Sequence, residues 1–165
     1  MNLRALGVIA LAHGTSDFYA GAVPFIVFYV VSTHGLSAVY QGMLGFLWYL
    51  TSSIVQPFFG AYTDRYGRWW FLPVGVLTTV IAVSLAGAAQ TTWLLAICIV
   101  LGGLGSAIMH PEAGKYSAML SGTQQARGIS IFQIGGQTGF ACGPIVVAAL
   151  ATRFGGSGSL FLAAV

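Results

Sequence analysis

Apolar residues dominate five stretches of the chain, and charged residues are rare within them. Each stretch runs for about 20 residues or more, the length that a helix needs to cross about 30 Å of hydrocarbon. Because backbone groups in lipid must bond within their own segment, we predict a helix for each stretch. The strict alternation of a membrane barrel is missing. The expected helices are 5–31, 38–60, 70–89, 92–113 and 127–151, and the longest expected loop is 114–126.

A sixth apolar segment begins near Ser157 and has reached only 165 where the sequence stops. A helix over 157–165 would be only about 13 Å long, which is too short to cross the membrane. We therefore expect the sixth helix to be incomplete and the sequence to be part of a longer protein. The run 5–31 is too long for a cleavable signal peptide.

Composition supports a polytopic all-α membrane protein. The chain is 57% hydrophobic and 5% charged, with a mean hydropathy of +0.86, whereas soluble proteins carry about 25% charged residues. The net charge of +3 comes without a basic run, so we expect no nucleic-acid partner.

The basic residues also predict an orientation. If the helices alternate in direction, Arg153 falls on one side of the membrane and the other cations fall on the opposite side. Those other cations are Arg4, Arg65, Arg68, Lys115 and Arg127. Because basic residues are retained in the cytoplasm, the N-terminus is predicted to be cytoplasmic.

An acidic residue, Asp17, lies inside the first expected span. A charge near a helix centre costs about 2.5–3.5 kcal/mol on insertion scales, so its presence needs a reason. His13 lies four residues earlier and therefore on the same helix face. The pair is interpreted either as a proton-coupling or substrate-contact site or as a structural hydrogen bond between neighbouring side chains.

The second and fifth helices also carry polar and glycine-rich faces. Gln56 belongs to a face of 38–60 that also carries Gly42, Gly45 and Gly60, and it is a candidate cavity residue, although packing is the simpler interpretation for that face. In the fifth helix, Gln133 and Gln137 could line a cavity. A separate face, suited to close helix contact and a kink, consists of Gly135, Gly139, Gly143 and Pro144.

The fourth helix is expected to end at His110-Pro111-Glu112. Glu112 should then lie near the cytoplasmic interface, where the simplest partner is Arg65 or Arg68. His110 could titrate near neutrality or could cap the helix through a hydrogen bond.

The segment from Gly60 to Trp69 resembles the signature loop that follows the second helix of major facilitator superfamily transporters. That pattern is Gly, three residues, Asp, a basic residue, any residue, Gly, Arg and a second basic residue. Trp69 stands in place of the final basic residue. This difference would weaken the contact that the loop makes between the two halves of such a transporter. The other signature positions are Gly60, Asp64, Arg65, Gly67 and Arg68.

Three further segments resemble the fosmidomycin-resistance branch of that superfamily: 12–17, 110–112 and 130–137. The resemblance implies the N-terminal six-helix half of a twelve-helix exporter, built as a 3+3 inverted repeat and coupled to protons. It further implies that the loop Asp64–Arg68 latches the two halves, and that His13 and Asp17 match the branch's polar pair in helix 1. The arginine that many facilitator antiporters carry in helix 4 is missing here.

The expected function is therefore proton-coupled efflux of a small molecule, such as a drug, by alternating access across the cell membrane. Two rival hypotheses are a sugar or organic-acid uniporter or importer of the same fold, and a six-helix membrane module without transport. The expected partners are a small-molecule substrate, protons, the bilayer and a C-terminal six-helix half. No enzyme activity, cofactor or metal site is predicted, because no nucleophile arrangement or metal-ligand spacing occurs in the sequence.

Overall fold

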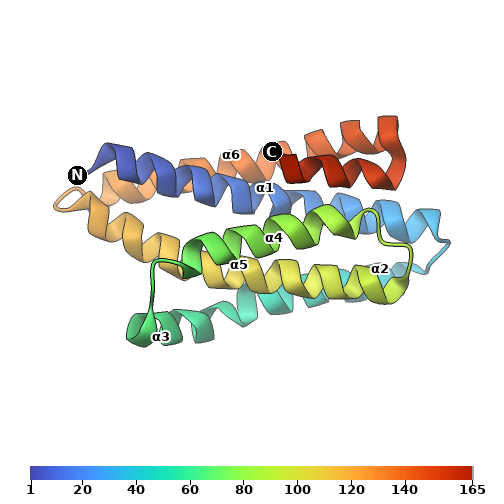
Figure 1. Ribbon diagram of the computed structural model, residues 1–165, viewed down its shortest axis with the longest axis horizontal. Helices are drawn as coiled ribbons and strands as arrows, with labels where there is room; N and C mark the ends of the chain where they lie inside the picture. Colours follow the sequence, from blue (N-terminus) through green and yellow to red (C-terminus); the bar gives the residue numbers. More distant parts are fainter. Residues whose placement is uncertain (165) are drawn as a thin grey trace.

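The computed structural model describes residues 1–164 as an elongated bundle of helices that run along one another (Figure 1). No strand occurs in this range, so the all-α expectation is confirmed. The elements in chain order are α1 (Leu3–Thr33), α2 (Ala38–Tyr49), the π-helical turn η1 (Leu50–Ile54), α3 (Gln56–Tyr66), α4 (Phe71–Ala86), α5 (Thr92–Ser121), α6 (Gln125–Phe154) and the 3-10 helix η2 (Gly155–Ala164).

Short polar side chains fix the starts of three helices. The side chains of Asn2, Ser37 and Thr91 each accept a hydrogen bond from the backbone N–H three residues later, at 3.2–3.3 Å. Such caps satisfy backbone donors that have no partner within the helix. Gly122 has a φ of 57°, which lets α5 turn sharply into α6.

Glycines allow α1 and α6 to lie unusually close together (Figure 1). A Cβ atom added to Gly135, Gly139 or Gly143 would collide with a backbone carbonyl of α1. Without side chains at these positions the two helix backbones can pack directly, as small residues allow in membranes. The α6 glycine face of the sequence is therefore the surface that α1 covers.

The outside of the bundle is suited to lipid. α1, α5 and the continuous helical stretch from α6 into η2 are long and apolar enough to cross a membrane. Large apolar side chains are exposed on them, including Leu11 at 74% and Ile145 at 70%. Buried side chains such as Val23, Ile26 and Ile99 form the main core.

The fourth expected helix was predicted too short. α5 does not end at 113 but continues to Ser121, so the loop before α6 is only 122–124 instead of 114–126. Pro111 is accommodated inside the helix. Ser117 and Ser121, which appear loop-like in sequence, are fully buried against α6, and the Ser117 hydroxyl donates to the Gly128 carbonyl at 3.4 Å.

Two other boundaries differ from the expectation. The second helix does not stop at 60, because α3 continues to Tyr66 after the π-helical turn. The sixth segment starts at Gly155 as a 3-10 helix and is held to the bundle by hydrogen bonds. The Tyr19 hydroxyl donates to the Leu162 carbonyl, and the Ser159 hydroxyl donates to the Ser84 carbonyl at 2.7 Å.

Candidate functional site: a buried histidine–aspartate cluster

Two histidines converge on one carboxylate inside the bundle. His13 Nε2 lies 3.1 Å from Asp17 Oδ2, and His110 Nε2 lies 3.0 Å from Asp17 Oδ1. His13 and Asp17 belong to α1, whereas His110 comes from α5. The His13 residue is only 4% exposed. The three side chains therefore form one polar cluster inside the bundle.

Backbone carbonyls orient both imidazole rings. His13 Nδ1 lies 2.9 Å from the Phe132 carbonyl oxygen, and His110 Nδ1 lies 2.8 Å from the Ser106 carbonyl oxygen. A carbonyl can only accept a hydrogen bond, so each Nδ1 carries the hydrogen. The Phe132 ring also stacks on the His13 ring, with 3.9 Å between centroids. Each Nε2 is consequently directed at the carboxylate.

Gly136 of α6 closes the cluster on the side next to His13. A Cβ atom there would lie 2.7 Å from Asp17 Oδ2 and 2.7 Å from His13 Nδ1. Any side chain would push against the polar atoms themselves. Sequence reasoning did not select Gly136 as a site residue, because only the packing of α6 on α1 places it there.

A polar cavity of about 210 Å³ opens beside the cluster. Asp17 and His110 line it on one side. Gln56, a candidate cavity residue from the sequence, lines it too, together with Ser52 and Ser53 from η1. The arrangement can hold a small polar group or ion next to a buried carboxylate.

The family of this chain follows from its similarity to known proteins. The model of the Major Facilitator Superfamily matches residues 7–165. The chain belongs to the major facilitator superfamily. This agrees with the long apolar helices and with the resemblance of the Gly60–Trp69 segment.

Individual transporters are similar to most of the chain. The chain is 32% identical over 150 residues to the fosmidomycin resistance protein of Escherichia coli, a match that covers 91% of the chain and 37% of that protein. It is 29% identical over 154 residues to the uncharacterized transporter YfnC of Bacillus subtilis, covering 93% of the chain and 38% of the relative. The chain thus spans well under half the length of these relatives.

Multidrug resistance proteins are also similar to this facilitator chain. The protein MdtG of Serratia proteamaculans is 30% identical over 146 residues, which are 86% of the chain and 35% of MdtG. No solved structure matches significantly.

The facilitator signature segment is partly helical instead of a loop. Asp64 and Arg65 lie in the last turn of α3, and Gly67 and Arg68 follow it. Both Asp64 and the arginines are exposed. Gly60, also in α3, faces α5, where an added Cβ would lie 3.6 Å from Pro111 Cβ.

The expected ion pair between Glu112 and an arginine is wrong. Glu112 Oε1 instead accepts from Lys115 Nζ at 2.7 Å, and the Glu112 side chain is fully buried. Because α5 continues as a helix past Pro111, Lys115 lies one turn away on the same face. Gly67 packs on this pair, since an added Cβ would lie 2.8 Å from Lys115 Nζ.

Other expected site residues are not gathered at the cluster. Gln133 and Gln137 are exposed on α6 and do not line the polar cavity. His110 was expected at the end of its helix, where it could titrate or cap the helix, but it lies inside α5 and contacts Asp17. Nothing in the local sequence signals this contact, because it joins residues far apart in the chain.

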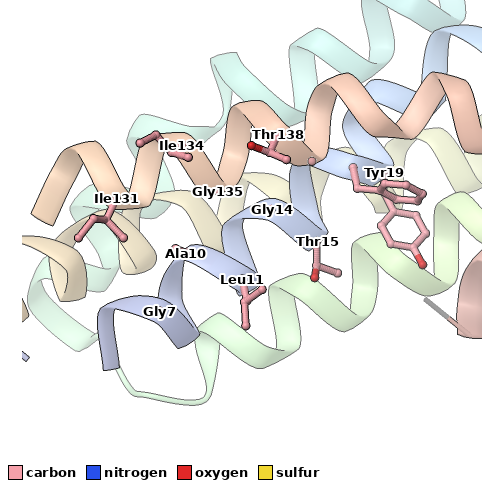
Figure 2. A pocket seen from close by; sticks show the side chains of 12 residues that line it. Gly7, Ala10, Leu11, Gly14, Thr15, Tyr19, Ile131, Ile134, Gly135 and Thr138 are labelled. Atoms are coloured by element: carbon pink, nitrogen blue, oxygen red, sulfur yellow. The ribbon is translucent and has the colours of Figure 1, made fainter. Parts of the chain in front are cut away.

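A larger groove of about 510 Å³ runs between α1 and α6 (Figure 2). Figure 2 shows that its floor is formed by small residues, among them Gly7, Ala10, Gly14 and Gly135. Ile131 and Ile134 flank it with apolar side chains. The groove offers mainly apolar contact, with the hydroxyl-bearing side chains of Thr15, Tyr19 and Thr138 among its lining, whereas Asp17 and His110 line the separate polar cavity.

Proposed function

We propose that the chain is the N-terminal half of a proton-driven antiporter that exports a small organic molecule by alternating access. The observation that carries this proposal is the partly buried Asp17 carboxylate, held between two histidines at the edge of a polar cavity. Ionisable residues inside membrane spans are costly and mark ion or substrate pathways. Membership of the facilitator superfamily and the names of the drug-resistance relatives support the direction of transport.

The proposed substrate cavity would be shared with a second six-helix half. The relatives are more than twice as long as the matched region, which leaves room for such a half. Specificity in such cavities depends on a few polar groups among apolar walls. In this half the candidates are Gln56, Asp17 and His110, and the exposed Gln133 and Gln137 are candidates for the surface that meets the second half.

We further propose that the protein lies in the cell's inner membrane with its N-terminus in the cytoplasm. The basic residues near the N-terminal end of the bundle support this orientation. Asp64, Arg65 and Arg68 would then be cytoplasmic, where the signature segment is proposed to hold the two halves together.

Transport in vesicles tests the function. The full-length protein would be reconstituted with a pH-sensitive dye inside, and fosmidomycin would serve as the first probe because a relative is named for resistance to it. Addition of the compound should move protons, and Asp17→Asn should abolish this movement while the protein still inserts. The matched control is His34→Ala, which alters an exposed histidine in the turn after α1.

Each other outcome favours a different hypothesis. Normal coupling in Asp17→Asn would remove Asp17 from the mechanism. Substrate movement that ignores a collapsed proton gradient would favour a uniporter of the same fold. If a panel of drugs, sugars and organic acids gave no movement at all, the chain would be part of a membrane module without transport.

A further inference from the structure

Three potential metal ligands meet at the buried cluster. His13, Asp17 and His110 each offer one ligand atom, and these atoms all lie within 4.8 Å of one another. Imidazole nitrogen and carboxylate oxygen are the donors that Zn²⁺ and neighbouring divalent transition metals bind. The sequence did not suggest this set, because His110 is separated from the other two by most of the chain.

The hydrogen-bond pattern leaves both Nε2 atoms as acceptors in the neutral rings. Each Nδ1 donates its hydrogen to a backbone carbonyl, of Phe132 for His13 and of Ser106 for His110. Each Nε2 then presents a lone pair to an Asp17 oxygen that is also an acceptor, at 3.0–3.1 Å. Contacts this close between acceptors require a hydrogen or a metal ion between them, the hydrogen being carried either by Nε2 or by the Asp17 carboxyl.

The geometry is close to that of a metal site. With Zn–N and Zn–O bonds of about 2.0–2.1 Å, ligand atoms at tetrahedral angles stand about 3.3 Å apart. The observed separations of 3.0 and 3.1 Å join the two Nε2 atoms to different Asp17 oxygens, and the three ligand atoms lie within 4.8 Å of one another, so the side chains draw together around a bound ion. Metal-binding histidines characteristically donate their other N–H to a carbonyl or carboxylate, and both rings here already do so.

The fourth coordination position would face the polar cavity. Asp17 and His110 form part of the wall of this cavity, and Gln56 and Ser52 lie on it as well. A site with three protein ligands and one open position is the arrangement in which Zn²⁺ binds water or another small ligand. The cavity also supplies a path by which a hydrated ion can reach the cluster.

We infer that His13, Asp17 and His110 form a binding site for a divalent transition-metal ion of the Zn²⁺ class, with its open position toward the polar cavity. This inference does not depend on the proposed transport function, because it concerns binding in the absence of any gradient. An ion at this position would lie in the wall of the proposed substrate pathway. It would either block that pathway or move along it.

Cobalt binding tests the site directly. Co²⁺ takes the place of Zn²⁺ and gives visible absorption that reports its ligands. The full-length protein, purified in detergent, would be titrated with Co²⁺ and then with Zn²⁺. We expect one Co²⁺ per chain, displaced by Zn²⁺, and affinity at least about 100-fold weaker in Asp17→Asn and His110→Ala.

Replacing one metal-binding side chain by another distinguishes loss of the site from misfolding of a variant. His110→Cys keeps a donor at the same position, so it should bind Co²⁺ and add a thiolate-to-cobalt charge-transfer band in the near ultraviolet. His34→Ala removes the exposed histidine and should leave binding unchanged. Equal Co²⁺ affinity in the wild type and in Asp17→Asn would overturn the inference, as would no binding by the wild type, which would leave hydrogens as the bridge at the cluster.

Discussion

At the scale of single residues, the close contact between α1 and α6 depends on glycines, which have no side chain. Gly139 lies directly against the carbonyl of Gly14 in α1. Gly139→Ala must push the two helices apart, so we expect it to destabilise the protein by about 1–3 kcal/mol, the usual cost of overpacking. Thermal unfolding of the purified protein in detergent, followed by tryptophan fluorescence, measures the loss.

Gly42→Ala is the matched control for this prediction. A Cβ atom at Gly42 would meet nothing within 4 Å, and the same holds at Gly45, so among the described residues these two glycines do not make the close packing expected for their helix face. Because alanine favours a helix over glycine, Gly42→Ala should leave stability unchanged or slightly higher. Equal destabilisation by both substitutions would contradict the contact seen here.

At the scale of elements, the junction of α3 and α5 contains the ion pair of Glu112 and Lys115. The Lys115 ammonium also donates to the Thr63 carbonyl of α3 at 3.3 Å. Lys115→Met would leave the Glu112 carboxylate buried without its partner. We expect a loss of about 3 kcal/mol, since breaking one side of a buried pair is strongly destabilising. Chemical denaturation in mixed detergent measures this change.

The double substitution Glu112→Gln with Lys115→Met separates charge from packing. It removes the unpaired charge, so it should recover much of the stability that Lys115→Met loses. Arg127→Met, which removes an exposed cation from α6, is the control and should change stability little. A double variant no more stable than Lys115→Met would show that the lysine acts through packing alone.

At the scale of the whole molecule, the turn between α1 and α2 and the turn between α5 and α6 lie at opposite ends of the bundle (Figure 1). His34 belongs to the first turn and Thr123 to the second. The N-terminus belongs to the Thr123 end, since the Asn2 N–H donates to the Leu120 carbonyl at 2.9 Å. In a cysteine-free background, His34→Cys should react with a membrane-impermeant maleimide in intact cells, and Thr123→Cys only after permeabilisation. The reverse pattern would place the N-terminus outside.

Much of the fold follows from the sequence for a simple physical reason. Within a bilayer an apolar run of about 20 residues can only form a helix, so a helix beginning at Thr92 and the other spans could be anticipated without knowledge of their neighbours, although the end of that helix at Ser121 could not. The contact of His13 with Asp17 was also predictable, because a spacing of four residues places them on one helix face. Both features depend only on residues that are close together in the chain, so the local sequence is sufficient to predict them.

Tertiary packing decided the rest. Local signals at Pro111 favoured the end of a helix, but the burial of Ser117 and Ser121 against α6 continues α5 past it. Because α5 continues past Pro111, Glu112 pairs with Lys115 and not with Arg65 or Arg68. His110 reaches Asp17 only because α5 crosses α1 at that level. The sequence determined which segments enter the membrane, whereas the meeting of distant helices decided which polar groups share a site, because side-chain contacts between helices have no signature within either one.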